Sequence, residues 1–486
     1  MGAPASPHSA PGASTPAASV AANLPARRYD ARGRAHVDYR AVLLLAGPLI
    51  ANSAVQAIMN LTDTWFVGRV STTATAAVGA VYWPILCVLI FLGGVAMAVQ
   101  TLAAHAHGAG RYRRAAQATW AGIYASLLTI PLFALAAYGG GPLLAIAGLD
   151  PEVQRLALEY WWPRLLAGGP VGLLVWALTS FFNGIGRARV TLLVTGVMAV
   201  SNVFFNEWFM FGLGLGVAGA AWGTVAANAL GLVVAGAFFL GPRVRQRYRP
   251  ELGWRHPQLA RQFRLGLPMG LTATADMLGL ALFQLMLTAS GTVAGATSQI
   301  VVMVTSIAYM PGVGIAMAGT TLVGQAIGAG DRDWAARLGN RVILLAVGFM
   351  SVLGFAFAIA GPWLMPLFVN AADPNAEAAV ALGVVLLWIA ATYQAFDGLQ
   401  LGCSFCLRGA GDVRVPAVLV ATLAWLGWVP ATHMLTFAPG EGWVDFLPQF
   451  GYGAVGGWIA AVVYVIALGA ALGWRWRSGA WRRLRV

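Results

Sequence analysis

The chain contains one long sequence unit twice. Thr101, Gly108 and Gly110 have counterparts at Thr321, Gly328 and Gly330, each 220 positions later. Other matching residues recur at the same offset or, after a short insertion, at a slightly larger one: Pro48 and Pro268, Gly141-Pro142 and Gly361-Pro362, Asp150-Pro151 and Asp373-Pro374, Gly184 and Gly409, Gly186 and Gly411. A repeat of this length indicates two copies of one structural unit.

The composition places both copies in a lipid bilayer. Apolar residues make up 59% of the chain, charged residues 10%, and the mean hydropathy is +0.72. Each half has six apolar stretches that are long enough to cross the hydrocarbon core. We predict spans at 41–68, 75–103, 116–138, 160–183, 190–212, 217–240, 263–289, 293–325, 336–360, 379–406, 415–437 and 453–473. The expected fold is an all-α integral membrane protein with twelve helices in two pseudo-two-fold-related six-helix lobes, a plan typical of secondary transporters.

The positive charge is distributed asymmetrically. All 30 basic residues are arginine, and the formal net charge is +13. Only Arg69, Arg155 and Arg164 lie outside the two tails and the even-numbered loops. The positive-inside rule therefore predicts that both termini are cytoplasmic. We expect the charge to set membrane topology, so it does not indicate a nucleic-acid partner.

The predicted domains follow from the spans. We expect a disordered cytoplasmic tail (1–39), an N-lobe (40–242), a basic cytoplasmic linker (243–262), a C-lobe (263–474) and a basic C-terminal tail (475–486). The first tail is rich in Pro, Ala and Ser and has no apolar run before Val42, which excludes a cleavable secretory signal there. A transit peptide is the alternative. The arginine-for-lysine usage favours a bacterial protein, and hence the inner membrane.

The sequence contains little that indicates an enzyme or a metal site. Cys403 and Cys406 have metal-ligand spacing but lie in a predicted span without a second pair, so we interpret them, with Cys87, as packing residues. His105 and His107 point to different helix faces, so we expect no metal site and no cofactor. No nucleophile motif or phosphate loop supports a membrane enzyme.

Four carboxylates fall within predicted spans: Asp63, Glu207, Asp276 and Asp397. An ionisable group at that depth is a candidate functional residue because it must face a watery or paired interior. Glu207 is the exception, since it lies about 100° around the helix from Asn206, and we expect it to be solvated at the interface.

Polar residues share helix faces with three of these acids. The spacings predict three stripes that face a cavity, namely Asn52, Gln56, Asn60 and Asp63; Tyr393, Asp397, Gln400 and Ser404; and Thr272 and Asp276. Further i, i+4 pairs are Asn202 with Asn206, Thr224 with Asn228, and Thr179 with Asn183. Each pair alone can equally be a helix-to-helix hydrogen bond.

Depth separates the polar residues into two groups. Asp276 and Asp397 are expected to lie level with each other, roughly 15 Å from the inner boundary. Asp63, Asn206 and Thr224 lie roughly 9–12 Å from the outer ends of their helices. Each lobe therefore has its own predicted polar cluster.

Several motifs resemble those of the multidrug and toxic compound extrusion (MATE) family, in an order and spacing that cover residues 41 to about 473. They are Asp63-Thr-Trp-Phe-Val-Gly68-Arg, the paired Gly-Ala-Gly loops, Asn202 with Gly216-Val-Ala-Gly-Ala-Ala-Trp222, Leu267-Pro268, Val323-Gly-Gln-Ala-Ile-Gly-Ala-Gly330-Asp, and Asp397 with Leu407-Arg408-Gly409-x-Gly411-Asp412.

The resemblance implies two facing six-helix lobes that export cationic drugs or toxic metabolites in exchange for H⁺ or Na⁺. By position it assigns ion coupling or substrate binding to six residues: Asp63, Asn202, Asn206, Thr224, Asp276 and Asp397. Cavity lining is predicted for Gln56, Asn60, Asn183, Asn228, Tyr393 and Gln400. Asn206 stands where one branch of the family often has Asp, so the ion and the coupling lobe stay open. No resident metal is expected, although Na⁺ can bind transiently at Asp63 or at Asp276 and Asp397.

Two further expectations follow. The chain is expected to act as a monomer in the lipid bilayer. The alternative within transport is a flippase for a lipid-linked oligosaccharide or another amphiphile. Such a flippase would show cations along its cavity, whereas the predicted spans contain acids and almost no arginine, which favours cationic substrates.

Overall fold

The computed structural model describes residues 24–146, 148–250, 256–369 and 374–484. Within them, twelve helices or helix groups are long and apolar enough to cross a membrane. The N-terminal six spans are α2 (Tyr39–Gly68), α3 (Thr72–Gly108), α4 to α6 (Tyr112–Leu128, Ile130–Tyr138, Gly140–Ile146), α7 with α8 (Pro151–Pro163, Gly169–Gly184), α9 (Ala188–Glu207) and α10 (Gly216–Leu240). The C-terminal six are α12 (His256–Ala289), α13 (Thr292–Gly328), α14 (Arg332–Leu364), α15 (Ala376–Ala410), α16 with α17 (Arg414–Thr422, Val429–Thr436) and α18 (Gly453–Arg477).

These helices confirm the predicted fold class. They also extend beyond the apolar stretches, because polar turns at the membrane surface continue the helical backbone. The short helix α11 (Pro242–Tyr248) connects the halves. The span that contains α12 starts at Pro257 rather than at 263, so part of the predicted linker is helical, and residues 251–255 of that linker lie outside the described residues.

Two spans are interrupted by π-helical turns next to a proline. The turn Arg164–Gly168 precedes Pro170 of α8, and the turn Leu423–Trp428 precedes Pro430 of α17. Proline lacks the backbone N–H and its ring crowds the preceding turn, so the hydrogen-bond pattern widens there. The first of these turns places Arg164 inside the membrane region.

The duplicated glycines end equivalent helices. Gly110 and Gly330 follow α3 and α13 with φ of 68° and 91°, and Gly186 and Gly411 follow α8 and α15 with φ of 78° and 83°. Only glycine adopts this left-handed conformation without steric cost, which explains why these positions recur in both halves.

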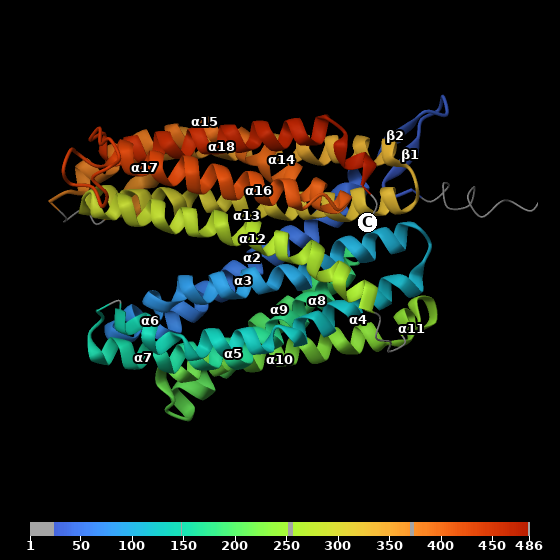
Figure 1. Ribbon diagram of the computed structural model, residues 1–486, viewed down its shortest axis with the longest axis horizontal. Helices are drawn as coiled ribbons and strands as arrows, with labels where there is room; N and C mark the ends of the chain where they lie inside the picture. The colour runs from blue at the N-terminus through green and yellow to red at the C-terminus, as the bar shows by residue number, and fades with distance from the viewer. Residues whose placement is uncertain (1–23, 147, 251–255, 370–373, 485–486) are drawn as a thin grey trace, which may run out of the picture.

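The helices form two lobes that lie together at one end and diverge toward the other (Figure 1). Two buried apolar clusters form their cores. The first helix of each half crosses between lobes: α2 packs against α13, and α12 packs against α3. Glycine permits both crossings, since a Cβ at Gly94 would lie 2.3 Å from Gly270 N and one at Gly314 would lie 2.7 Å from Ile50 N. The two contacts are repeat equivalents of each other.

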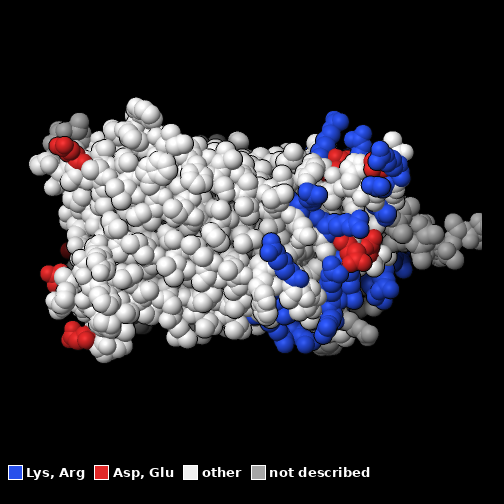
Figure 2. Space-filling view, turned by 90° about the horizontal axis from the view of Figure 1, so that it is seen from above, with Lys and Arg blue, Asp and Glu red and all other residues white. Residues whose placement is uncertain are grey.

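Charge is concentrated at one end of the molecule. Figure 2 shows the arginines gathered at the end that carries α11 and the C-terminus, with a white, uncharged belt beside it. We call this the basic end. The belt is the surface expected of a protein embedded in lipid.

The prediction of a disordered N-terminal tail is wrong for the part that the structure describes. Strands β1 (Arg27–Tyr29) and β2 (Ala35–Val37) form an antiparallel hairpin. Trp334 Nε1 donates to the Pro25 carbonyl at 3.0 Å, and Val37 is buried. Local composition cannot predict this order, because it depends on contacts with α14. Residues 1–23 lie outside the described residues.

Candidate functional site

The N-lobe cluster joins three helices around Asp63. Asp63 comes from the last turns of α2, Asn202 and Asn206 from α9, and Thr224 from α10. Asn206 Nδ2 donates to Asp63 Oδ1 at 2.7 Å, and Thr224 Oγ1 donates to Asp63 Oδ2 at 3.4 Å. The sequence predicted a common depth for Asp63, Asn206 and Thr224, and their direct contact in the structure agrees with that prediction.

Asn202 supports the same cluster from behind. Its Oδ1 accepts from Asn206 Nδ2 at 3.3 Å, and its Nδ2 donates to Thr224 Oγ1 at 3.5 Å. Asn206 Oδ1 is buried and has no hydrogen-bond partner in the described part of the chain. A carboxylate beside amide and hydroxyl oxygens can bind a proton or a hard cation such as Na⁺.

The C-lobe has a separate acidic cluster. Tyr464 Oη of α18 donates to Asp276 Oδ1 of α12 at 2.7 Å, and the Tyr464 ring stacks on Trp428 with ring centroids 4.7 Å apart. Asp276 and Asp397 lie near enough to repel each other electrostatically, and Tyr309 interacts with both.

Asp276 also lines a cavity of about 200 Å³ within the C-lobe. Thr272, Gln400 and Ser404 contribute polar groups to it, as their shared helix faces predicted. The cavity contains a cation as well, because Arg408 near the end of α15 lines it. The sequence prediction treated the spans as nearly free of arginine and did not use Arg408.

The other predicted cavity residues differ in their surroundings. Gln56 and Asn228 are half-buried and Asn60 is exposed. Tyr393 is half-buried and stacks on Trp458, with ring centroids 6.4 Å apart. Asn183 is different: it is buried, and its Oδ1 accepts from Thr191 at 2.7 Å. The structure thus gives Asn183 the helix-to-helix contact that was its alternative interpretation.

Two pairs of hydrogen bonds hold the lobes together toward the basic end. Thr101 Oγ1 of α3 donates to the Arg408 carbonyl at 3.1 Å, and Thr321 Oγ1 of α13 donates to the Asn183 carbonyl at 2.9 Å. These two bonds are repeat equivalents that run in opposite directions between the lobes.

The second pair follows the same symmetry. His105 Nε2 donates to the Gly409 carbonyl at 2.7 Å, and Gln325 Nε2 donates to the Gly184 carbonyl at 2.8 Å. We call these four bonds the inter-lobe clasp. All four acceptors are backbone carbonyls at the ends of α8 and α15, where helices leave carbonyl groups short of partners. The Asn183 and Arg408 carbonyls also accept a backbone N–H from the turn that ends each helix, so the clasp gives each of them a second donor. The clasp closes the basic end, while Asp63 lies toward the diverging end.

The histidines and cysteines serve packing and hydrogen bonding. His105 belongs to the clasp, and His107 Nδ1 contacts Tyr248 Oη at 2.8 Å. Cys403 and Cys406 are buried free thiols, as predicted. No group of three His, Cys, Asp or Glu side chains suited to a metal occurs among the described residues.

Glu207 occupies the surface, as predicted. Its carboxylate pairs with Arg69 at 3.0 Å, and the two side chains are 54% and 43% exposed. An exposed ion pair of this kind contributes little to stability.

Sequence reasoning missed two partners of the acids. Arg164 interacts electrostatically with Asp63, and Tyr464 hydrogen-bonds Asp276. Arg164 carried a signal, because it lies within the predicted span 160–183, where an arginine is uncommon. Tyr464 carried none, since a single tyrosine in an apolar helix does not indicate its partner.

Comparison with known proteins agrees with the duplicated helical plan. The family model described as MatE matches residues 48–208 and 268–431, one segment in each half. The probable multidrug resistance protein NorM of Rhizobium meliloti (strain 1021) is 31% identical over 452 residues, which cover 90% of this chain and 92% of the relative.

Solved structures share the arrangement of helices. A crystal structure of MATE in complex with MaL6 matches with a TM-score of 0.80 and 19% identity, over 91% of this chain and 97% of that one. An outward-facing multidrug resistance MATE family transporter of the MOP superfamily matches with a TM-score of 0.78 and 18% identity, over 91% and 96%. At these identities the likeness establishes a common fold.

Proposed function

We propose that this chain, which belongs to the MatE family of secondary transporters, exports organic, mostly cationic compounds from the cytoplasm in exchange for H⁺ or Na⁺. Its family makes it a membrane transporter of small molecules rather than an enzyme. Its twelve apolar helices and bacterial relatives indicate a multi-pass protein of the bacterial inner membrane.

The observation that carries the proposal is the contact set of Asp63. One carboxylate in the membrane region receives a donor from Asn206 and another from Thr224, and it interacts with Arg164. A protein retains such a charge in a membrane when the charge is used. A proton, Na⁺ or a drug cation can each bind there, but two of them compete for one negative charge.

Competition for one charge produces exchange. If the ion-bound and drug-bound forms favour states that open on opposite sides, each binding step shifts the population of states. The membrane potential supplies about 2.3 kcal/mol per charge for each 100 mV, in addition to the concentration term of the ion.

The clasp supports an orientation for this cycle. By the positive-inside rule the basic end faces the cytoplasm, so both termini are cytoplasmic in this proposal. A structure held closed by the clasp is then closed to the cytoplasm, and Asp63 lies on the side from which the ion arrives.

The two acidic clusters give the proposal two versions. Coupling through Asp63 would use the free Asn206 Oδ1 as an additional oxygen ligand for Na⁺. Coupling through Asp276 and Asp397 would let one proton relieve the repulsion between two carboxylates. Each version predicts a different set of inactive variants.

Ion-driven efflux from proteoliposomes tests the proposal. Wild-type protein and the variants Asp63→Asn, Asp276→Asn and Asp397→Asn would be reconstituted, and ethidium efflux followed under an imposed pH gradient and, separately, an imposed Na⁺ gradient. Glu207→Gln is the matched control, because it also neutralises a carboxylate but at the exposed surface.

Efflux under one gradient, lost in particular Asp variants and kept in Glu207→Gln, would identify the ion and the coupling lobe. Efflux at wild-type rate in all three Asp variants would overturn the assignment of these acids. If folded protein moves no cation under either gradient, the flippase alternative is favoured, and Arg408 in the C-lobe cavity becomes its candidate cation.

A further inference from the structure

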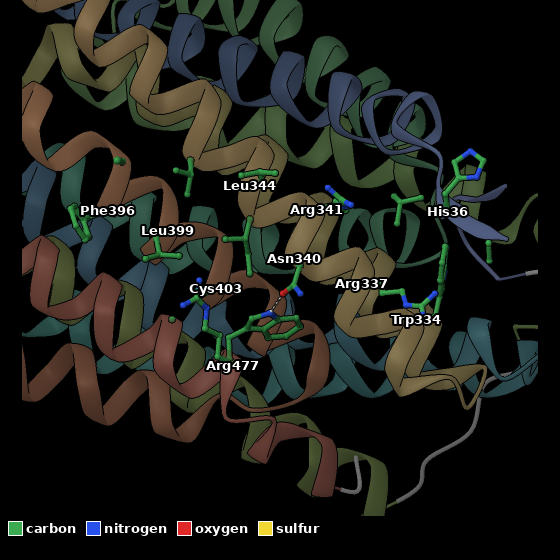
Figure 3. Close-up of a pocket in the computed structure, with 17 residues that line it drawn as sticks. His36, Trp334, Arg337, Asn340, Arg341, Leu344, Phe396, Leu399, Cys403 and Arg477 are labelled. Carbon is green, nitrogen blue, oxygen red and sulfur yellow. Dashed lines mark hydrogen bonds between the residues drawn. The ribbon is translucent and has the colours of Figure 1, made fainter. Parts of the chain in front are cut away.

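A large cavity lies outside both acidic clusters, on the outer side of the C-lobe at the basic end. It has a volume of about 880 Å³ and lies between α14, α15 and α18, with the hairpin β1–β2 at one edge. Figure 3 shows His36 and Trp334 at that edge, and Phe396 and Leu399 farther along the cavity. We call it the outer groove.

Three arginines line the mouth of the outer groove. Arg337 and Arg341 lie one turn apart on α14, and Arg477 is the last residue of α18. All three are exposed, and the lining contains no aspartate or glutamate. None of the three forms a salt bridge with a described residue. The mouth therefore has an uncompensated positive charge.

The position of the three arginines matches the headgroup layer. Arg337 and Arg341 are five and nine residues from the start of α14 at Arg332, which corresponds to roughly 8 and 14 Å along the helix axis. Asn340 Oδ1 accepts from Trp476 Nε1 at 2.7 Å, which fixes α14 beside the end of α18. Arginine at this level can pair with phosphate through parallel hydrogen bonds.

The remainder of the groove is apolar and open to lipid. Leu344, Val347, Phe396 and Leu399 line it below the arginines. Leu344 is 57% exposed and begins a row of exposed apolar side chains on α14 that continues through Val352 and Ile359. A bound molecule thus needs an anionic head at the surface and a hydrocarbon tail in the membrane.

We propose that the outer groove binds an anionic phospholipid from the leaflet at the basic end, with its phosphate on Arg337, Arg341 and Arg477 and an acyl chain along Leu344 and Leu399. Basic pockets between membrane helices bind such headgroups by the same combination of charge and apolar surface. The site is independent of the acidic clusters, because its lining shares no residue with them.

Native mass spectrometry of the purified full-length protein tests the site, with phosphatidylglycerol, phosphatidylcholine and inorganic phosphate as the three probes. The first variant is Arg337→Gln with Arg341→Gln. Its matched control is Arg243→Gln with Arg245→Gln, two exposed arginines of α11 at the same end. Each double variant loses two positive charges, so the two differ only in the place of the substitution.

A second variant changes only the apolar part. Gly473→Leu adds a side chain inside the groove, where a Cβ meets Leu399 at an ordinary contact distance of 3.5 Å, so the backbone tolerates the substitution. A phospholipid needs this space, whereas a free phosphate does not.

We expect phosphatidylglycerol to bind wild type and the α11 control equally well. It should bind the Arg337/Arg341 variant roughly 30-fold more weakly, because each of the two lost arginines contributes a comparable share of the binding free energy near an anionic headgroup. Gly473→Leu should also lose phosphatidylglycerol. Phosphatidylcholine should bind all forms weakly. Equal binding by both double variants would overturn the proposal in favour of general charge attraction. Retained binding in Gly473→Leu, or equal competition by inorganic phosphate, would overturn the lipid assignment.

Discussion

The side-chain amide of Asn206 donates to the Asp63 carboxylate at 2.7 Å, across 143 positions of the chain. This contact joins α2 to α9 inside the membrane region, where few groups can replace it. It is the shortest hydrogen bond within the N-lobe cluster, compared with 3.3 to 3.5 Å for the others.

Removal of this donor should impair transport. Asn206→Ala removes the shorter of the two hydrogen bonds to the Asp63 carboxylate and leaves the Thr224 contact at 3.4 Å. A hydrogen bond to a charged group contributes about 1.5–3 kcal/mol. We expect ion-driven efflux to fall about tenfold or more in proteoliposomes. Ser201→Ala is the control, because the Ser201 hydroxyl bonds only to carbonyls of its own helix. Equal efflux by the two variants would contradict a role for the contact.

The Tyr464 hydroxyl provides the corresponding test in the C-lobe. Tyr464→Phe removes the donor to Asp276 but keeps the ring that stacks on Trp428. If the C-lobe couples the ion, this variant should shift the pH dependence of efflux while the thermal unfolding temperature changes little. Tyr452→Phe, at an exposed position, is the control. An unchanged pH profile would place coupling elsewhere.

Weakening the clasp should open the basic end. Thr101→Val with Thr321→Val removes two of its four bonds at nearly constant volume, at about 1 kcal/mol each. The population of the state open at the basic end should rise roughly 30-fold. Distances between spin labels at positions 111 and 332, in a background without the native cysteines, would report the change.

The control for the clasp is Thr119→Val. The Thr119 hydroxyl is buried and bonds to the Ala115 carbonyl within its own helix. Longer distances in the clasp variant alone would support a closing role for the inter-lobe bonds. The same distance distribution in both variants would show that the two threonine bonds are not needed to keep this end closed.

The crossing of α3 and α12 should tolerate no side chain at Gly94. A Cβ there would lie 2.3 Å from Gly270 N and 2.4 Å from the Gly266 carbonyl oxygen, both backbone atoms. Gly94→Ala should therefore lower the free energy of unfolding by about 1–3 kcal/mol, measured by thermal unfolding in detergent. Gly79→Ala, on the same helix, meets nothing within 4 Å and should leave stability nearly unchanged.

Local sequence patterns were sufficient for the fold. The length of the twelve apolar stretches follows from the thickness of the membrane. Gly110 and Gly330 recur because the backbone is left-handed at both positions. The arginine distribution follows from which loops lie on the cytoplasmic side of the membrane. The helix faces also showed that Asp63, Asp276 and Asp397 face inward. Those inferences need only the period of the helix and the cost of burying charge.

Only the tertiary structure decided which groups meet. The partners Tyr464 and Arg164, the order of residues 24–38 and the clasp from Thr101 to Arg408 all join segments far apart in the chain. A periodic pattern states which way a side chain points but not which helix lies opposite. The packing of two lobes, set by close glycine contacts and by hydrogen bonds to helix ends, determines those pairs.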